Sequence, residues 1–297
     1  MKKTRILIVG GAGYVGGFMV DVLLNQNYEV FVYDNLIYED RYLKRVKFIY
    51  GDVRDREYLI SLFKSYKFDI IIWLAAIVGD GACEVDPWLT QAINEDSVKW
   101  LVDNFNGKLV FASTCSVYGI NNDLIDEYAD VNPLSRYAKT KLAAEKYIVE
   151  NHNDFLIFRL GTLFGLGDEH SRIRLDLVAN ILTKKAAFKE KLTVFGGDQW
   201  RPLLHVRDVA YAVSKGIDNN CKGLYNLSYE NFRIKDIANE IKDLIPSTQI
   251  IFQEMKTEDQ RNYRVSSNLY RRTGWSHNFT LKDGISELYA IFMENRI

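Results

Sequence analysis

The sequence predicts an α/β fold: a doubly wound parallel sheet followed by a smaller C-terminal lobe. The first half alternates short apolar runs with amphipathic stretches, which is typical of strands buried on both faces and joined by crossover helices. Near Gly161 the rhythm breaks, and the polar segment 165–174 leads into an amphipathic helix and shorter elements. We therefore expect a sheet domain over residues 1–162. Residues 163–297 are expected to form mainly a substrate-binding lobe, with some segments returning to the first domain.

Each predicted strand is a short apolar run, and each predicted helix has apolar residues at helical spacing. The strands are expected at residues 5–9, 29–33, 46–50, 69–74, 108–112 and 155–159. The helices are expected at residues 14–25, 58–66, 94–105 and 137–151. Strands and helices in alternation favour parallel pairing, because a parallel connection needs a crossover long enough to hold a helix.

Composition excludes several classes of protein. The chain has 297 residues, 47% of them hydrophobic, and its 38 Lys and Arg balance 39 Asp and Glu, a net charge of −1. This balance argues against disorder and against binding to nucleic acid or to a membrane surface, since those partners need clustered cations. Residues 1–4 run directly into the first strand, and no apolar run is long enough to span a bilayer. We expect a cytoplasmic protein.

The cysteines and histidines are too few and too scattered for a disulfide framework or a metal site. There are three cysteines without a CxxC pair, and four histidines. A structural zinc site needs four closely spaced ligands from these residue types. We therefore expect no bound metal.

A glycine-rich turn follows the first predicted strand. Gly10, Gly13 and Gly16 enclose Tyr14 and Val15 and open the first predicted helix. In a dinucleotide site the first glycine allows a tight turn, the second lets the backbone approach a pyrophosphate, and the third lets helix and strand pack closely. A glycine-rich turn of purely structural role is the alternative. The position of the turn, directly between a strand and a helix, favours a Rossmann-type cofactor site over this alternative.

An acidic residue after the second strand indicates which dinucleotide binds. Asp34 lies 24 residues after Gly10, near the offset at which a carboxylate accepts hydrogen bonds from the adenosine ribose. Its charge favours NAD over NADP, unless Arg41, Lys44 or Arg45 folds back to hold a phosphate. An ordinary Asp at a strand end is the other reading. Further cofactor contacts are expected from Asn35, Asp52, Val53, Leu74, Ala75 and Ala76.

A phenol and an ammonium stand four residues apart at Tyr137 and Lys141, on one face of a predicted helix. A second pair with this spacing occurs at Tyr211 and Lys215 in the later lobe, so the spacing alone is uninformative. Tyr137 is distinguished by Thr114, a hydroxyl in the segment that ends the strand 23 residues earlier. We therefore predict that Tyr137, Lys141 and Thr114 act together. Thr114 could instead cap its own turn.

These residue types suit the oxidation of an alcohol by a nicotinamide. A base must take the hydroxyl proton as the hydride leaves, and free tyrosine, with a pKa of about 10, is too rarely ionised. A lysine charge about 4 Å away, at an effective dielectric near 20, contributes roughly 4 kcal/mol, or about three pKa units. With the positive nicotinamide, this would bring the phenol near neutrality. Thr114 would hold the substrate oxygen, and Lys141 the nicotinamide ribose.

These motifs, in this order, resemble the extended short-chain dehydrogenase/reductase superfamily, in particular its NAD-dependent nucleotide-sugar epimerase/dehydratase family. The resemblance continues through residues 200–208 and the late Gly274-Trp275. It implies a catalytic Tyr137, Lys141 and Thr114, a tightly held NAD, and a nucleoside-diphosphate sugar between the lobes. It also implies a homodimer in which residues 94–105 and 137–151 of each subunit form a four-helix bundle.

Departures from the family pattern bear on the reaction. Sugar 4,6-dehydratases place an Asp-Glu pair directly after the hydroxyl residue, whereas this chain has Cys115 and Ser116 there, which disfavours a dehydratase. Many 4-epimerases have an Arg-x-x-Asn stretch that contacts the substrate, and here Thr162 takes the place of the Asn. Residues 172–180 and 260–264 look like those of a branch that includes sugar 4-dehydrogenases.

Substrate contacts are expected from Thr114, Thr162, Asn180, Arg201 and Arg261. A guanidinium can bind phosphate oxygens at two points, and Arg201 matches the family's arginine before a His-Val pair. For Arg172 and Arg174, phosphate contact and a surface or dimer role are equally open.

The leading hypothesis is NAD-dependent oxidation at C4 of a nucleotide-linked sugar, by an epimerase or a 4-dehydrogenase of surface-polysaccharide or sugar biosynthesis. An epimerase re-reduces the 4-keto sugar on its other face, and a dehydrogenase releases it. Two alternatives remain: an NAD(P)H-dependent reductase of 4-keto sugars, which Asp34 disfavours, and a dinucleotide-binding regulator without turnover. Fold analogy does not decide among them.

Overall fold

The computed structural model describes residues 3–254 and 261–294. Among these residues, seven strands form one parallel sheet in the order β11-β7-β5-β4-β1-β2-β3. The chain runs outward from β1 to β3 and then returns to the other side of β1, so that a topological switch point lies between β1 and β4. This order confirms the predicted Rossmann-type sheet. The strands are β1 (Arg5–Val9), β2 (Glu29–Asp34), β3 (Lys47–Tyr50), β4 (Ile70–Trp73), β5 (Lys108–Thr114), β7 (Phe155–Leu160) and β11 (Gly223–Leu227).

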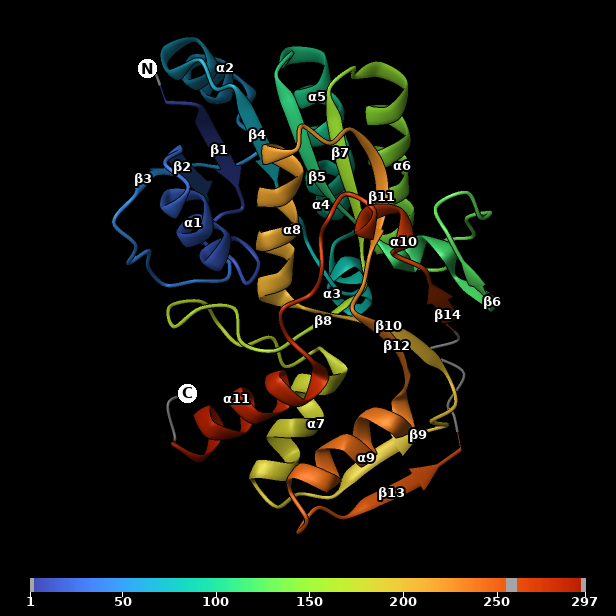
Figure 1. The fold of residues 1–297 in the computed structure, drawn as a ribbon. Coiled ribbons are helices and arrows are strands. Elements are labelled where there is room, and N and C mark those ends of the chain that lie inside the picture. The colour runs from blue at the N-terminus through green and yellow to red at the C-terminus, as the bar shows by residue number, and fades with distance from the viewer. Residues whose placement is uncertain (1–2, 255–260, 295–297) are drawn as a thin grey trace.

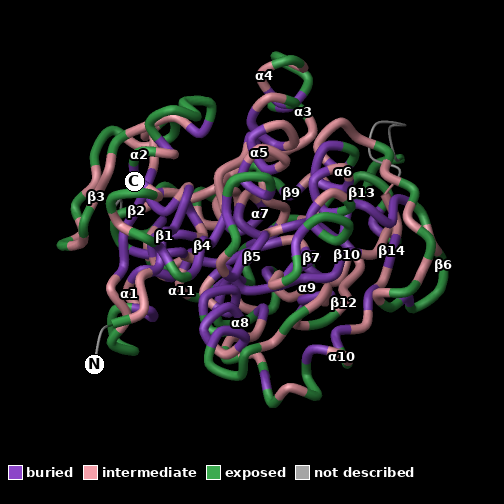
Figure 2. Tube along the Cα trace, turned by 90° about the horizontal axis from the view of Figure 1, so that it is seen from above, coloured by how far each residue is buried: buried purple, intermediate pink, exposed green. Residues whose placement is uncertain are grey.

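Helices cover both faces of the sheet (Figure 1). Side chains alternate between the faces along β1: Ile6 and Ile8 pack into one apolar core, and Leu7 and Val9 into another. The first core includes residues of α1 (Gly16–Asn25) and α8 (Val206–Asp218). The second includes residues of α2 (Arg56–Tyr66), α5 (Ser97–Asn104) and α6 (Arg136–Asn151). Figure 2 shows the buried central strands between these layers.

The later part of the chain forms a second lobe below the carboxyl ends of the strands (Figure 1). Its core joins α7 (Val178–Ala187), α9 (Ile234–Leu244) and α11 (Leu281–Met293). The last of these begins at a capping box, in which Thr280 and Asp283 each accept a backbone N–H from the other. The strands of the lobe are β8 (Thr162–Phe164), β9 (Leu192–Phe195), β10 (Trp200–His205), β12 (Glu230–Arg233) and β13 (Ile250–Gln253).

The chain crosses between the two parts more than once. After β10 it returns as α8, which packs on α1, and as β11, which extends the large sheet beside β7. Later, β14 (Asn262–Val265) pairs with β6 (Ile120–Ile125). The remaining short elements are α3 (Asp80–Val85), α4 (Pro87–Gln91), α10 (Asn268–Arg271) and the 3₁₀ turn η2 (Cys115–Tyr118).

Three predicted helices start two residues from the expected position. The first begins at Gly16, not at residue 14, and the second begins at Arg56, not at residue 58. The helix expected at residues 94–105 is a π-helical turn, η1 (Ala92–Asp96), continued by α5. Within the turn Asn94 is buried, and its amide pairs with the backbone of Ile77, which follows β4 (2.8 and 2.9 Å). This side-chain pairing anchors the wider turn to the loop after β4.

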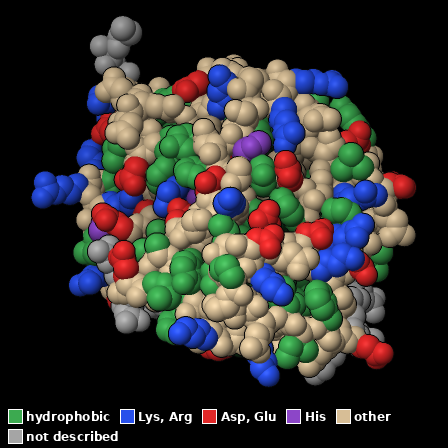
Figure 3. Space-filling view, turned by 60° about the horizontal axis from the view of Figure 1, so that its bottom comes forward, with side chains coloured by type: hydrophobic (Ala, Val, Ile, Leu, Met, Phe, Trp, Pro, Cys, Tyr) green, Lys and Arg blue, Asp and Glu red, His purple; other side chains and the backbone are tan. Residues whose placement is uncertain are grey.

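No helix among the described residues is both long and apolar enough to cross a membrane. Figure 3 shows the face that includes the second lobe, where acidic and basic side chains are interspersed.

A buried ion pair joins α6 to the sheet. The guanidinium of Arg159 on β7 binds both carboxylate oxygens of Glu145 on α6, and Ser113 of β5 donates to the same carboxylate (2.8 Å). Arg159 also donates to the hydroxyl of Tyr118 (2.8 Å), which donates to Asn226 of β11 (2.8 Å). The pair is almost inaccessible to water, with side-chain exposures of 7% and 3%. Each charge is therefore stabilised mainly by the other and not by water.

Replacing Arg159 by Met should destabilise the fold strongly, because the Glu145 carboxylate would stay buried without its cation. We expect the free energy of unfolding in urea to fall by about 3–5 kcal/mol. The matched control is Lys235→Met, which breaks a more exposed pair with Asp198 in the second lobe and should cost less than about 1 kcal/mol. Equal losses for the two variants would contradict this assignment.

Candidate active site

One pocket, with a cavity volume of about 610 Å³, lies where the carboxyl ends of the sheet strands meet the second lobe. Ligands of open α/β sheets bind at this place, next to the switch point. Most of the predicted site residues line it: Gly10, Gly13, Tyr14, Val15, Asp34, Asn35, Val53, Leu74, Ala75, Ala76, Thr114, Tyr137, Lys141, Thr162, Arg201 and Arg261.

The glycine turn forms one end of the pocket. Gly10 has φ +83°, and a Cβ there would lie 2.5 Å from the backbone nitrogen of Ala75, so only glycine fits. At Gly16 a Cβ would lie 2.5 Å from the Cα of Gly11, which explains the close packing at the start of α1. A Cβ at Gly13 would meet only the Gly10 carbonyl oxygen, at 3.6 Å. The turn therefore presents bare backbone to the pocket, as a bound pyrophosphate requires.

Asp34 stands at the end of β2 beside this turn. Its carboxylate accepts backbone N–H groups of Ala12 (3.0 Å) and Leu36 (2.8 Å). Burial raises the pKa of this carboxyl, and the hydrogen bonds of Leu36 and Ala12 oppose the rise. Asp34 thus holds the glycine turn in place through the N–H of Ala12, and it also lines the pocket. This second role was not foreseen from the sequence.

Asp52 takes a different place from the one expected. Its carboxylate binds the guanidinium of Arg54 at two points (2.8 Å each) and accepts from Asn35 (3.2 Å). Arg54 is the main reason that its pKa falls to about 2. Its neighbours Gly51 and Val53 line the pocket, whereas Asp52 does not. Asp52 therefore shapes the wall of the pocket through its neighbours.

The loop between β2 and β3 (residues 35–46) is held against the segment that bridges β8 and α7 (residues 165–177, here the bridging segment). Lys44 pairs with Asp168 at 3.0 Å, and both side chains are at most 10% exposed. The backbone N–H of Arg172 donates to Glu39 (3.3 Å). Because Lys44 is occupied in this way, it is not placed to hold a 2′-phosphate. These contacts agree with the preference for NAD that Asp34 predicts.

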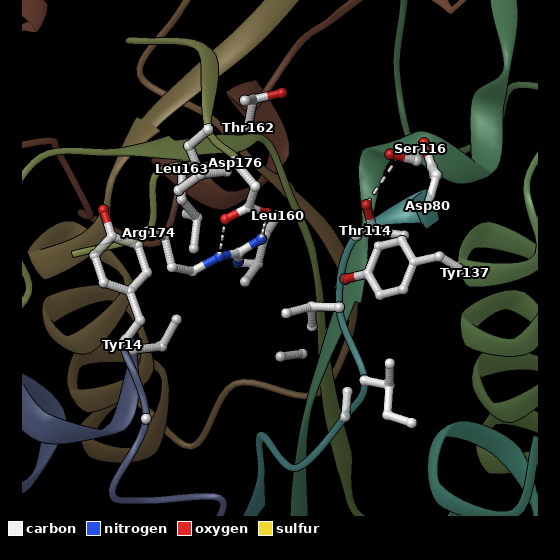
Figure 4. A pocket seen from close by; sticks show the side chains of 18 of the residues that line it. Tyr14, Asp80, Thr114, Ser116, Tyr137, Leu160, Thr162, Leu163, Arg174 and Asp176 are labelled. Carbon is white, nitrogen blue, oxygen red and sulfur yellow. Dashed lines mark hydrogen bonds and ion pairs between the residues drawn. The ribbon is translucent and has the colours of Figure 1, made fainter. Parts of the chain in front are cut away.

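Tyr137, Thr114 and Lys141 all line the pocket. Tyr137 lies in the first turn of α6, where the Ser135 side chain accepts the N–H of Ala138 and caps the helix. Thr114 ends β5, and its hydroxyl accepts the backbone N–H of Ser116 (3.1 Å), so it does cap its own turn η2, as the alternative interpretation of the sequence held. Figure 4 shows the side chains of Tyr137 and Thr114 next to each other. Lys141, one turn along α6, is 2% exposed, with its nitrogen 4.0 Å from the centre of the Phe111 ring.

Burial shifts the pKa values of both Tyr137 and Lys141. It raises the pKa of Tyr137 to about 12, although Arg174 and the Thr114 hydrogen bond lower it. It also lowers the pKa of Lys141 to about 7, against the opposing effect of Glu145. The Tyr137 pKa near neutral pH that the sequence led us to expect therefore does not follow from these side chains alone. The sequence estimate counted the lysine charge and left out the cost of burying both groups.

Two of the predicted arginines, Arg201 of β10 and Arg261 next to β14, line the pocket. The buried guanidinium of Arg201 donates to the carbonyls of Trp200 (2.9 Å) and Arg261. Arg261 pairs with Asp80 at 2.9 Å. Of the stretch 260–264 that the sequence singled out, Gln260 lies outside the described residues. Both arginines line the same pocket as the glycine turn.

Asn180 corrects one sequence prediction. It was expected to bind the substrate, but it is completely buried and does not line the pocket. Its amide accepts the N–H of Gly165 (3.0 Å) and donates to the Arg174 carbonyl (3.0 Å) and the Tyr14 hydroxyl (3.3 Å). It therefore fastens the bridging segment to α7 and to Tyr14 next to the glycine turn.

Sequence reasoning missed several residues that line the pocket. Ser116 and Tyr263, whose hydroxyls are 3.2 Å apart, both reach it, as do Asp80 and Asp176. The neighbouring Cys115 instead points to the Arg159 carbonyl (3.1 Å), and burial raises the pKa of its thiol. No local spacing connects these residues, because they come from four separate segments.

The fold and the pocket define a dinucleotide-binding enzyme with a phenol, a hydroxyl and an ammonium at its centre. The family model described as "NAD dependent epimerase/dehydratase family" matches residues 6–228. The chain therefore belongs to the NAD-dependent epimerase/dehydratase family, as its motifs predicted, and NAD is its cofactor.

Curated relatives and solved structures agree with this assignment. The UDP-glucose 4-epimerase of Halalkalibacterium halodurans is 29% identical over 78% of this chain and 78% of its own length. A crystal structure of a UDP-glucose 4-epimerase is 26% identical, covers 99% of this chain and 98% of its own, and has a TM-score of 0.86. The Thermus thermophilus UDP-glucose 4-epimerase in complex with NAD shares the fold, with a TM-score of 0.84, 24% identity, and coverage of 97% and 99%.

The low pKa of Lys141 predicts a pH-dependent stability. Between its folded value of about 7 and its ordinary value of 10.5, the unfolded chain binds more protons than the folded protein, so a rise in pH favours folding. We expect the unfolding free energy of the wild type minus that of Lys141→Met to rise from pH 7 to 9, by up to about 1.4 kcal/mol per pH unit.

The control for this measurement is Lys139→Met on the exposed face of the same helix, for which the difference from wild type should stay flat with pH. A flat difference for Lys141→Met as well would show that Lys141 keeps an ordinary pKa in the folded protein.

Proposed function

We propose that the protein oxidises a nucleoside-diphosphate sugar at C4 and re-reduces it on the opposite face, as a nucleotide-sugar 4-epimerase of surface-polysaccharide or sugar biosynthesis. One observation carries the proposal. Tyr137 and Thr114, which lie next to each other in Figure 4, line the same pocket as the glycine turn, Arg201 and Arg261. A dinucleotide at the glycine turn and a diphosphate at the two arginines would bring their reactive groups together at these hydroxyls.

Residues of the chain fit NAD along the cofactor end. The bare backbone at Gly13 would receive the pyrophosphate, and Asp34 the adenosine ribose. When bound, NAD supplies the hydride acceptor and a positive ring next to the phenol. Lys141, at the floor of the pocket, would bind the nicotinamide ribose.

The chain's own groups would manage the proton and the oxygen at C4. Tyr137 would accept the hydroxyl proton as the carbon is oxidised and return it on re-reduction. Thr114 would hydrogen-bond the oxygen in both its hydroxyl and its carbonyl form. The charges of Arg174 and, when protonated, Lys141 would stabilise the phenolate, because an opposite charge favours an ionised group. At the far end, Arg201 and Arg261 would bind the diphosphate.

Replacing Tyr137 by Phe should abolish most turnover while NAD stays bound, because only the proton acceptor is removed. We expect conversion of UDP-glucose into its C4 epimer, followed by chromatography, to fall about 10²–10⁴-fold. The control is Tyr211→Phe, the second Tyr/Lys match, which lies on α8 outside the pocket and should retain wild-type turnover.

Other outcomes of this assay distinguish the alternatives. NADH accumulating in proportion to a released 4-keto sugar would indicate a dehydrogenase. Consumption of a 4-keto sugar with NADPH in preference to NADH would indicate a reductase. Unchanged cellular function of Tyr137→Phe with NAD still bound would indicate a regulator.

We also propose that the protein is a homodimer through α5 and α6, which pack side by side. Val149 on α6 is 47% exposed, although it is apolar. Val149→Glu should lower the mass measured by light scattering from about twice the 34.4 kDa of one chain to 34.4 kDa. Phe252→Glu, at an exposed apolar residue of β13 in the second lobe, should leave the mass unchanged. A wild type that is already monomeric would overturn this proposal.

We propose a cytoplasmic location for this enzyme. All three cysteines are free thiols, which suits a reducing compartment.

A further inference from the structure

The bridging segment carries an ion pair that faces the catalytic residues. Figure 4 shows Arg174 and Asp176 across the pocket from Tyr137 and Thr114, with the guanidinium pointing toward the middle. Nε of Arg174 donates to Asp176 at 3.1 Å, and Nη2 donates to the other carboxylate oxygen. The two groups thus form a two-point pair, the strongest geometry for an arginine and a carboxylate.

The acidic partner is the more exposed member of this pair. The Arg174 side chain is 12% exposed, whereas that of Asp176 is 52% exposed. Partial burial raises the pKa of Asp176, but hydrogen bonds from Arg174 outweigh it and hold the pKa below its ordinary value. At neutral pH, therefore, a ligand at this wall meets an ionised carboxylate that is half-exposed and whose charge Arg174 offsets only in part.

A second acidic residue of the pocket also pairs with an arginine, but through one of its oxygens. Asp80 also lines the pocket, and its carboxylate pairs with Arg261. In Figure 4 Asp80 lies on the side of Tyr137 and Ser116, opposite Asp176. The centre of the pocket thus has a carboxylate on either side, each matched by an arginine.

We propose that Asp176 selects sugars by charge: it accepts hydrogen bonds from the hydroxyls of a neutral hexose and rejects a uronic acid. A sugar hydroxyl can donate to the free edge of the carboxylate, whereas a sugar carboxylate would meet like charge from Asp176 and Asp80. Rejecting the wrong ligand by like charge is a recognised source of specificity. This inference rests on the proposed function, because it requires a nucleotide sugar in this pocket.

The test compares the binding of UDP-glucose and UDP-glucuronate by calorimetry to the NAD-loaded enzyme. The wild type should bind UDP-glucose more tightly, by at least about tenfold, the effect of a like charge at partly screened distance. Asp176→Asn should remove most of that ratio, mainly through tighter binding of UDP-glucuronate to the released Arg174 guanidinium. Asp176→Glu, which keeps the charge, should retain the preference.

The matched control is Glu169→Gln, the same acid-to-amide change on the bridging segment, at a side chain that is 84% exposed and outside the pocket. It should keep the wild-type ratio. Circular dichroism on each variant would show that it is folded.

UDP alone separates failure of this inference from failure of the proposed function. If UDP and both UDP-sugars fail to bind, the proposed function is overturned, and the role of Asp176 with it. If UDP binds but the wild type does not discriminate, or Asp176→Asn keeps the wild-type ratio, only the charge selection by Asp176 is overturned.

Discussion

The geometry of the candidate active site depends on the buried ion pair between Glu145 and Arg159. Glu145 lies one turn beyond Lys141 on α6, and its carboxylate also binds Ser113, the residue before Thr114. One interaction therefore sets the position of α6 relative to β5 and β7. Because Tyr137 and Lys141 belong to the helix and Thr114 to the strand, their separation follows from it. The cost of burying two charges is offset only in this paired arrangement.

Burial at the site also decides which protonation states are easy to reach. Without other charges, the phenol of Tyr137 and the amine of Lys141 both move toward their neutral forms. The folded chain therefore depends on charges brought close to the phenol to ionise it, and Arg174 is one that it supplies itself. A bound nicotinamide would add another. The phenol of Tyr137 would then ionise mainly when the pocket is filled, and it would stay protonated in the empty pocket.

The bridging segment couples the two ends of the pocket. Asp168 binds Lys44 of the β2–β3 loop, the Arg172 backbone binds Glu39, and Arg174 and Asp176 face the hydroxyls of Tyr137 and Thr114. Asn180 fastens the same segment to the Tyr14 hydroxyl and to α7. A single stretch of 13 residues thus contacts the β2–β3 loop and faces Tyr137 and Thr114. It lies between β8 and α7, so it enters and leaves the second lobe at the pocket.

The sequence by itself determined the parallel sheet, the glycine turn and the Tyr137/Lys141 pair, because each rests on local spacing. Apolar runs, a strand-to-helix glycine turn and a one-turn helical offset are visible within a few residues. Only the tertiary structure placed Asn180 in the core, turned Asp52 toward Arg54, and brought Asp80, Asp176, Ser116 and Tyr263 to one pocket. Those positions depend on which distant segments pack together and on what burial does to a charge. Neither is encoded in the spacing of neighbouring residues.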